Sequence, residues 1–524
     1  MVADWRATGD GRGVRGRRRV TAAVALLLSA CVVSRGVRVE PVPREPVEVK
    51  SPVKAHLADG STVVFVEGAT VGRGRVQGKG VRHDLALQAS QPVTEIPLDR
   101  VVAMERFRDD VDATSSVLLS LAGAAAGVFA SAALAVAIFG SCPTVYSSPG
   151  GSPRLEAETF SHSIVRLFED RDLDRLSVDT DPDGRLRLEV RNEALETHYI
   201  NHLQVYEVRH DEAETVVPDQ GGAPVVVGPR GPPLSARSRA GLDLGRTLAR
   251  DDGEAFRTDA PTLAAARAGN LEDWIDLSFP APRGTDEAAL VLRARSSLLN
   301  TVLFYDVMLA DAGPRAIDWQ DGLDRISNAV ELGRFCRKYL GLRVLEWRDG
   351  EFHPLAQVAD PGPIAWHDVA VTVPVRPGQD EIRLRLTFVA DAWRIDTATL
   401  ARSVRREPPR VVPLAEVTGS GGLVEPAALR SLSAPDNDYL RTSPGQRFFA
   451  RFDPAPLARG ERRTLLLSSQ GYYTEWVRGD WLRASHPPRL FVPGEDALVD
   501  ALDRWRGRQA SLEARFETLR VPVH

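Results

Sequence analysis

The stretch 177–190, SVDTDPDGRLRLEV, sets the expected fold class. Two runs that alternate apolar and polar residues flank Pro182-Asp183-Gly184, which is typical of a β-hairpin closed by a tight turn. Similar runs with Gly, Asp or Pro turns follow at 198–210, 341–355, 366–375, 382–390, 447–453 and 463–477. Short strands separated by such turns predict an antiparallel β-sandwich body over residues 144–524.

Two segments of this body keep a helical period instead. Near 316–340, Trp319, Leu323, Ile326 and Val330 recur on one helical face. Close to the C-terminus, one apolar stripe is formed by Leu498, Leu502, Trp505, Leu512, Phe516 and Leu519. We therefore expect a mainly β (α+β) chain in which two or more helices pack against sheets.

The segment 52–108 alternates short β-type runs with glycine turns and predicts a small N-terminal β-barrel. Its strand spacing resembles that of small Sm-like barrels. The glycine-rich stretch GRGRVQG at 72–78 lies inside it. The glycine spacing is wrong for a dinucleotide loop, and no helix follows to hold a phosphate, so we exclude a nucleotide site there.

An uncharged block, LAGAAAGVFASAALAVAIFGSCPTVYS at 121–147, separates this barrel from the body. Residues 117–139 are apolar apart from serines and glycines, and as a helix they would extend roughly 34 Å, enough for a hydrocarbon core of about 30 Å. We therefore expect a transmembrane-like helix over 113–140, ended by Gly140 and Pro143. A buried helix of a soluble domain, or an alanine-rich hairpin, is the alternative.

Small residues recur at every fourth position of this block, namely Gly123, Gly127, Ser131 and Ala135. Such a groove lets helix backbones approach closely in a lipid bilayer, so it predicts a homo-oligomer formed through this helix. Two topologies stay open. Either the helices oligomerise in a membrane and expose the body beyond it, or the block lies against the membrane without crossing.

The first 31 residues indicate a secretion signal. Arginines precede a short apolar run, Val20 to Leu28, and the end of this run, LSAC at 28–31, resembles the lipobox of bacterial lipoproteins. The resemblance implies lipidation of Cys31 and a bacterial cell-envelope location, and Val32 after the cysteine implies sorting to the outer membrane. An uncleaved signal anchor is the alternative.

The segment 139–210, with SCPTVY at 141–146, resembles large bacterial envelope proteins that lack an assigned activity. The resemblance implies no catalytic residue. We expect seven parts: signal peptide 1–31, linker 32–51, barrel 52–108, apolar helix 113–140, β-sandwich domain 144–285, α+β domain 286–405, and β-rich C-terminal domain 406–524.

Composition and motifs exclude several function classes. The net charge is −5, and the leader holds the one cluster of arginines, so a nucleic-acid partner is not expected. The sequence contains no nucleophile elbow, phosphate loop or zinc-protease helix, and we predict no catalytic residue from it. A site assembled in space from distant residues is not excluded by this test.

One candidate metal site follows from the opening stretch. Asp179, Asp181 and Asp183 with Gly184 form D-x-D-x-D-G, the start of a calcium loop. The twelfth position of that loop needs a glutamate and is Val190 here. A solvated turn explains the same residues without a metal ion, and a Ca²⁺ site is kept as the alternative. We expect no cofactor other than this candidate Ca²⁺.

Histidines and cysteines offer weaker signals. His198 and His202 lie in a strand pattern, which separates them by about 13 Å and excludes one shared zinc ion. Cys142 and Cys336 could form a disulfide outside the cytoplasm.

The stretch 471–482, GYYTEWVRGDWL, carries a group of aromatic residues, Tyr472, Tyr473, Trp476 and Trp481. They could stack on sugar rings, which makes an envelope glycan a candidate partner; packing in the core is the alternative. We expect a membrane-tethered envelope lipoprotein with a structural, assembly or ligand-binding role. An envelope hydrolase acting on glycan or peptide, and a calcium-stabilised adhesion module, are the competing hypotheses.

Overall fold

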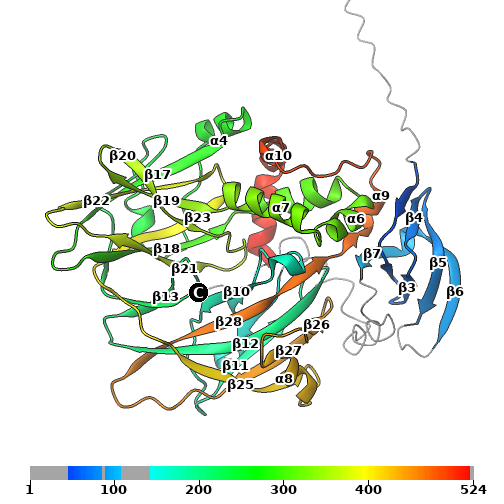
Figure 1. Cartoon of the computed structure of the whole chain (residues 1–524), viewed down its shortest axis with the longest axis horizontal. Coiled ribbons are helices and arrows are strands. Elements are labelled where there is room, and N and C mark those ends of the chain that lie inside the picture. The colour runs from blue at the N-terminus through cyan, green and yellow to red at the C-terminus, as the bar shows by residue number, and fades with distance from the viewer. Residues whose placement is uncertain (1–44, 85–88, 108–141, 520–524) are drawn as a thin grey trace, which may run out of the picture. The chain divides into compact units, whose positions relative to one another are not determined.

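The computed structural model describes residues 45–84, 89–107 and 142–519, all of them within one compact unit (Figure 1). These residues form a mainly β protein with antiparallel sheets and packing helices, as the strand pattern predicted. The lipidation residue Cys31 and the helix expected at 113–140, with its four small residues, lie outside the described residues. Among the helices that the structure describes, none has the length and hydropathy to cross a bilayer.

An N-terminal sheet occupies the place of the expected barrel. Its strands are β1 (Val47–Val49), β2 (Val53–Leu57), β3 (Thr62–Phe65), β4 (Ala69–Gly72), β5 (Arg75–His83), β6 (Ser90–Pro97) and β7 (Val101–Arg106). One end of β5 pairs with β4 and the other with β3, so the sheet bends within this strand. Glycine is required at the bend, because a Cβ on Gly80 would lie 2.7 Å from the buried Phe65 ring. The late strand β29 (Val477–Arg478) joins the sheet beside β7.

A second sheet contains nine strands. Its strands are β8 (Thr144–Ser147), β9 (Arg154–Glu158), β10 (Asp170–Arg175), β11 (Leu186–Arg191), β12 (Glu196–His210), β25 (Arg410–Gly419), β26 (Leu440–Thr442), β27 (Arg447–Phe452) and β28 (Arg462–Glu475). The longest pair, β12 with β28, joins segments more than 250 residues apart in sequence. Non-local pairing therefore dominates this sheet.

The hairpin predicted at 177–190 is wrong, although its turn is present. The N–H of Gly184 donates to the carbonyl of Asp181 at 2.9 Å, as a tight turn requires. The flanking strands do not pair with each other: β10 pairs with β28, and β11 pairs with β27 and β8. The C-terminal strands supply these partners, and no local pattern announces them.

The middle of the chain forms a β-sandwich. One sheet contains β15 (Arg230–Gly231), β23 (Trp393–Ala401), β18 (Glu287–Ser296) and β21 (His367–Pro374); the other contains β16 (Ser235–Ser238), β17 (Glu272–Pro280), β22 (Glu381–Val389), β19 (Leu342–Arg348) and β20 (Glu351–Val358). Leu290 and Leu292 of β18 face the sandwich core. Ala289 and Val291 face a smaller core against β13 (Thr215–Pro218), β14 (Pro224–Val227) and β24 (Val404–Arg405). β17 pairs with β22, so one sheet crosses the domain boundary that was expected at residue 285.

Helices close one end of this sandwich. They are α4 (Ala260–Arg267), α5 (Leu298–Thr301), the π-helix η5 (Val302–Ala310), α6 (Arg315–Gly322), α7 (Ile326–Tyr339) and α10 (Glu495–Leu519); α8 (Pro426–Leu432) and α9 (Gly479–Arg483) lie elsewhere. The apolar stripe of α10 is confirmed, because Leu498, Leu502 and Trp505 are buried.

The helical face predicted near 316–340 is wrong in its second half. Ile326 and Val330 are 72% and 41% exposed, whereas Ala329, Leu332 and Phe335 are buried. The chain breaks between α6 and α7, so the helical phase restarts, and the neighbours of α7 choose its buried face.

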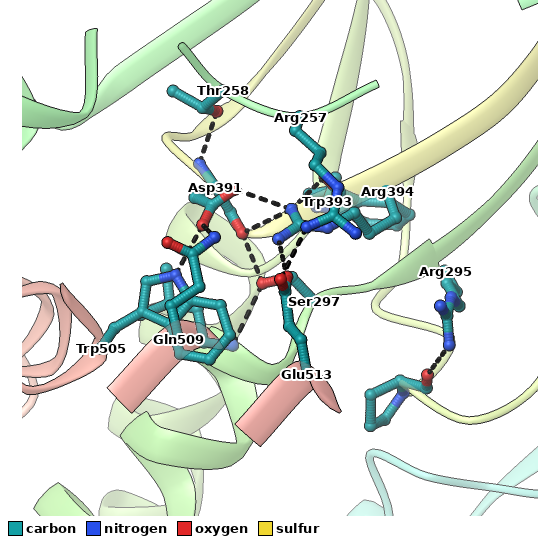
Figure 2. A network of polar contacts seen from close by, with 12 residues as sticks. Arg257, Thr258, Arg295, Ser297, Asp391, Trp393, Arg394, Trp505, Gln509 and Glu513 are labelled. Carbon is teal, nitrogen blue, oxygen red and sulfur yellow. Dashed lines mark hydrogen bonds and ion pairs between the residues drawn. The ribbon is translucent and has the colours of Figure 1, made fainter. Parts of the chain in front are cut away.

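A polar network fastens α10 to the sandwich (Figure 2). The Asp391 carboxylate accepts hydrogen bonds from the Trp505 indole at 2.5 Å and from Arg394 at 2.7 Å. Glu513 of α10 accepts from Arg394 at 3.1 Å and from Arg257 at 2.7 Å. Asp391 has φ of +61°, a left-handed conformation that Asp and Asn adopt more readily than most residues. This network fixes α10 beside η5, which contributes to the site described next.

Candidate functional site

A cavity of about 520 Å³, here called the apolar cavity, lies among α7, η5 and the segment 161–170. Most of its wall is apolar, formed by Ile164, Leu167, Phe168, Leu303, Phe304, Met308, Leu332 and Leu340. Its volume lies within the range of about 300–1,000 Å³ that is typical of small-molecule sites. The cavity is therefore the first candidate for a ligand site.

The π-helix η5 provides one wall of the apolar cavity. It contributes Leu303, Phe304, Tyr305 and Met308. π-Helical segments are rare and occur frequently at functional sites. This helix was not predicted from the sequence, although the apolar run LLNTVLFYDVMLA at 298–310 was a signal for it.

A glycine of α7, Gly333, also lines the apolar cavity. Gly333 stands inside α7, where glycine costs about 1 kcal/mol relative to alanine. A Cβ at this position would lie 3.6 Å from the Phe168 ring, an ordinary contact, so close packing does not require glycine. Nearby, Leu167 is 47% exposed although it lines the cavity. Leu167 thus adds an exposed apolar side chain to the lining of the cavity.

Polar groups hold the loop that closes one side of the cavity. The Asp360 carboxylate accepts hydrogen bonds from the Asn300 amide at 2.7 Å and from the backbone N–H of Gly362 at 3.0 Å. Asn300, Asp360 and Gly362 all line the cavity. These hydrogen bonds tie the loop around Asp360 to the start of the α5–η5 helix.

Five buried residues form what we call the acid cluster, namely Cys142, Glu158, Glu196, His198 and Glu475, each at most 3% exposed. The Cys142 thiol donates to Glu158 at 3.2 Å, and the Cys142 backbone N–H donates to Glu196 at 2.5 Å. The His198 Nε2 lies 2.7 Å from the same Glu196 oxygen. The Tyr305 hydroxyl hydrogen-bonds Glu475, so the cluster lies directly behind the cavity wall.

The acid cluster is unsuited to nucleophilic catalysis by cysteine. Burial, together with the neighbouring Glu158 and Glu196 carboxyls, raises the pKa of the Cys142 thiol well above its ordinary value. Burial also raises the pKa of Glu158 to about 7, against the effect of hydrogen bonds from two backbone N–H groups. The thiol is the protonated form at neutral pH, and the thiolate is the reactive one.

A buried Asp–His pair lies in a second, smaller cavity. Asp174 is 3.1 Å from Nδ1 of His367. Burial opposes the charge on the imidazole, but the Asp174 hydrogen bond outweighs it and raises the pKa of His367 to about 9. The neighbouring Ser177 hydroxyl donates to Glu156 at 2.7 Å. The cavity holds only about 60 Å³, too little for a glycan or a peptide.

The candidate calcium residues are paired with arginines. Asp179 accepts from Arg463 at 2.7 Å, while Asp181 and Asp183 accept from Arg187, each at 2.5 Å. Within the described ranges, no group of three or more His, Cys, Asp or Glu side chains is arranged to hold a metal ion. The three aspartates therefore form a salt-bridged turn in this structure.

The four aromatic residues do not form one exposed platform. Their rings are dispersed over the interior: Tyr472, Tyr473 and Trp476 are 8%, 1% and 2% exposed, and Trp481 is half-buried. Tyr472 stacks on Tyr199 at 4.5 Å, and Trp476 stacks on His56 at 3.9 Å. The prediction of a stacking surface made of all four is wrong, because neighbouring strands already cover these ring faces.

The two histidines and two cysteines singled out in the sequence lie within the described residues. His198 and His202 both lie on β12, a strand as expected. Cys142 and Cys336 are both free thiols, so the structure contains no disulfide between them. Cys336 lines the apolar cavity.

Comparisons with known proteins find little. No family model matches the chain, and no curated protein matches it. The C-terminal carbohydrate-binding module (CBM6) of a marine laminarinase from Zobellia galactanivorans is 12% identical, covering 38% of this chain and 98% of its own, with a TM-score of 0.14. A GH31 alpha-xylosidase from Xanthomonas citri is 8% identical, covering 82% of this chain and 34% of its own, with a TM-score of 0.14. Similarities this weak carry no functional argument.

Proposed function

We propose that this protein is a lipid-anchored lipoprotein of the bacterial cell envelope whose β-rich body binds a ligand with an apolar chain. The observation that carries the ligand-binding part is the apolar cavity of about 520 Å³, whose lining includes the exposed Leu167. Two of its polar side chains, Asn300 and Asp360, hydrogen-bond each other, and most of the remaining lining is apolar. Burial of methylene groups from water, at about 0.8 kcal/mol each, would provide the affinity.

The anchoring part of the proposal rests on the sequence. LSAC at 28–31 would place a diacylglyceryl group on Cys31, and the proline-containing linker after it would hold the body away from the lipid surface. The apolar block 117–139 would add a second contact with a lipid bilayer, and Gly123, Gly127, Ser131 and Ala135 would let copies associate there. In the lipoprotein pattern, Val32 after the cysteine favours sorting to the outer membrane where the cell has one.

A fluorescent fatty acid tests the ligand-binding part. The purified full-length protein should bind the probe saturably, with one site per chain, and long-chain alcohols should displace it. Displacement should strengthen with each added methylene, because each one buries more apolar surface. Absence of saturable binding, or affinity independent of chain length, would overturn this part of the proposal.

Metabolic labelling with an alkyne fatty acid tests the anchor. The wild-type chain should incorporate the label, Cys31→Ser should not, and Cys142→Ser serves as the matched cysteine control. Protease treatment of intact cells then reports the side of the membrane, because a body on the cell surface is digested. Label retained in Cys31→Ser would refute lipidation at that residue.

Envelope hydrolysis is the competing hypothesis; the Asp174–His367 pair is the one acid–base pair considered for it, and the cavity of about 60 Å³ at this pair argues against it. An imidazole oriented by a carboxylate can act as a general acid or base. Chromogenic glycosides and peptide esters test this directly: turnover abolished by His367→Asn, but preserved in His353→Asn, would establish a hydrolase. No turnover by the wild-type protein removes this candidate.

A further inference from the structure

A third cavity, here called the polar groove, lies beside the apolar cavity. It measures about 520 Å³, and its lining includes Arg166, Glu169, Asn201, Asn437, Tyr439 and Gln470. The two cavities share Leu167 and Glu169 as wall residues. One wall element, η3 (Arg166–Phe168), therefore presents Arg166 to the groove and Phe168 to the apolar cavity. The two cavities therefore adjoin along this short segment of chain.

The polar side chains of the groove are held in place by one another. The Glu169 carboxylate accepts hydrogen bonds from the Asn201 amide at 2.6 Å, from the Gln470 amide at 3.0 Å and from the Tyr439 hydroxyl at 2.6 Å. Glu169 directly follows η3, Asn201 and Gln470 lie on β12 and β28, and Tyr439 lies just before β26, so the groove is built by the tertiary fold. Ligand binding would not have to order them first.

The chemistry of the groove suits hydroxyl groups. Asn and Gln carry both donors and acceptors, and so does each hydroxyl of a sugar. Arg166 adds donors: its guanidinium binds the Asn437 amide oxygen at 2.7 Å and lies 5.6 Å from the centre of the Tyr439 ring. Carboxylates also line the groove, at Glu169, Asp324 and Asp436, which disfavours a phosphate group.

An aromatic support lies behind the groove. Tyr439 contacts Tyr472 edge-to-face, with ring centres 5.5 Å apart, and contacts Tyr199 in the same way at 6.3 Å. Tyr472 is one of the aromatic residues that the sequence associated with sugar binding. Its place is behind Tyr439, where it positions the ring that borders the groove.

From these observations we infer that the ligand is a glycolipid-like amphiphile, whose apolar chain enters the apolar cavity and whose neutral sugar head occupies the polar groove. This inference rests on the proposed function, since the chain needs the apolar cavity. It goes further by assigning the head group and the residues that recognise it.

Displacement of the fluorescent fatty acid by amphiphiles with one common chain tests the head group. Dodecyl maltoside, dodecyl octaethylene glycol ether and dodecylphosphocholine are compared below their micelle concentrations, with maltose alone as a fourth probe. Dodecyl maltoside should bind at least tenfold more tightly than either other amphiphile. Asn437→Ala should weaken dodecyl maltoside three- to tenfold and leave the ether unchanged, because the ether has a single terminal hydroxyl in place of the ring hydroxyls of a sugar.

Asn270→Ala is the matched control. Asn270 is an exposed asparagine that also accepts a hydrogen bond from an arginine, Arg239 at 3.4 Å, but lies outside both cavities. Equal affinity for the maltoside and the ether, tighter binding of phosphocholine, or no effect of Asn437→Ala would overturn the head-group inference while the apolar site stands. Failure of every amphiphile to displace the probe would instead overturn the proposed function and this inference together.

Discussion

Replacing Gly333 with leucine should fill the apolar cavity without harming the fold. Gly333 lies inside α7, has an ordinary helical conformation and lines the cavity. A Cβ there meets Phe168 at 3.6 Å, which is ordinary contact distance. Leucine should also favour the helix by up to about 1 kcal/mol relative to glycine. The substitution therefore separates loss of binding from loss of stability.

The magnitude follows from the volume that the new side chain takes. Leucine adds four carbon atoms, which displace about four methylene groups of the ligand chain. Each displaced methylene forfeits about 0.8 kcal/mol of transfer free energy, so binding should weaken by about 3 kcal/mol. At about 1.4 kcal/mol per tenfold change, this corresponds to an affinity loss on the order of 100-fold.

Titration of the fluorescent fatty acid into both proteins measures this loss, and thermal unfolding checks the fold. Gly333→Ala is the control, because it gains the same helix preference but adds one carbon, so its affinity should fall by at most about fivefold. The melting temperature of both variants should equal or exceed that of the wild type. Wild-type affinity in a well-folded Gly333→Leu protein would refute the assignment of the cavity as the ligand site.

Three further predictions concern the buried polar groups. Burial opposes ionisation of Glu105, but the positive charge of Lys54 and other partners outweigh it and lower the pKa of Glu105 to about 2. The ionised carboxylate therefore stabilises the folded protein fully above pH 4.5, and this stabilisation is lost as the pH falls towards 2. Glu105→Gln should lower the free energy of unfolding by about 3 kcal/mol at pH 7 and much less at pH 3, measured by urea titration; equal losses at both pH values would contradict this pKa. Burial raises the pKa of Glu158 to about 7, so the melting temperature should fall as the pH rises from 4.5 through 7. Glu158→Gln should make the melting temperature less dependent on pH over this range. The same pH dependence in the variant and the wild type would argue against a buried, protonated carboxyl. Asp391→Asn keeps the shape of the side chain and tolerates the left-handed backbone, but it removes the negative charge beside Arg394. The free energy of unfolding, measured by chemical denaturation, should fall by about 2–4 kcal/mol. An unchanged free energy of unfolding would show that the network of Figure 2 is not needed to hold α10.

The sequence by itself determined the local elements of this protein. All six further strand runs, from 198–210 to 463–477, form strands, because alternation of apolar and polar side chains is a property of a few consecutive residues. The stripe of α10 was equally readable, since Leu498 and Trp505 repeat at helical spacing over an unbroken helix. Where the helical phase broke, between α6 and α7, the same method assigned Ile326 to the wrong face.

Only the tertiary structure decided how these elements pair and what they enclose. The strands on either side of the turn at 181–184 pair with β28 and β27, which lie more than 250 residues further along the chain. Such pairing depends on contacts between segments distant in the sequence, which no local pattern reports. The apolar cavity is assembled from 161–170, 300–308, 332–341 and 357–363, and no single segment carries its signature. The acid cluster gathers Cys142, Glu158 and Glu475 in the same way. Local periodicity reports which face of an element avoids water, whereas a site depends on distances between elements that only the packed chain sets.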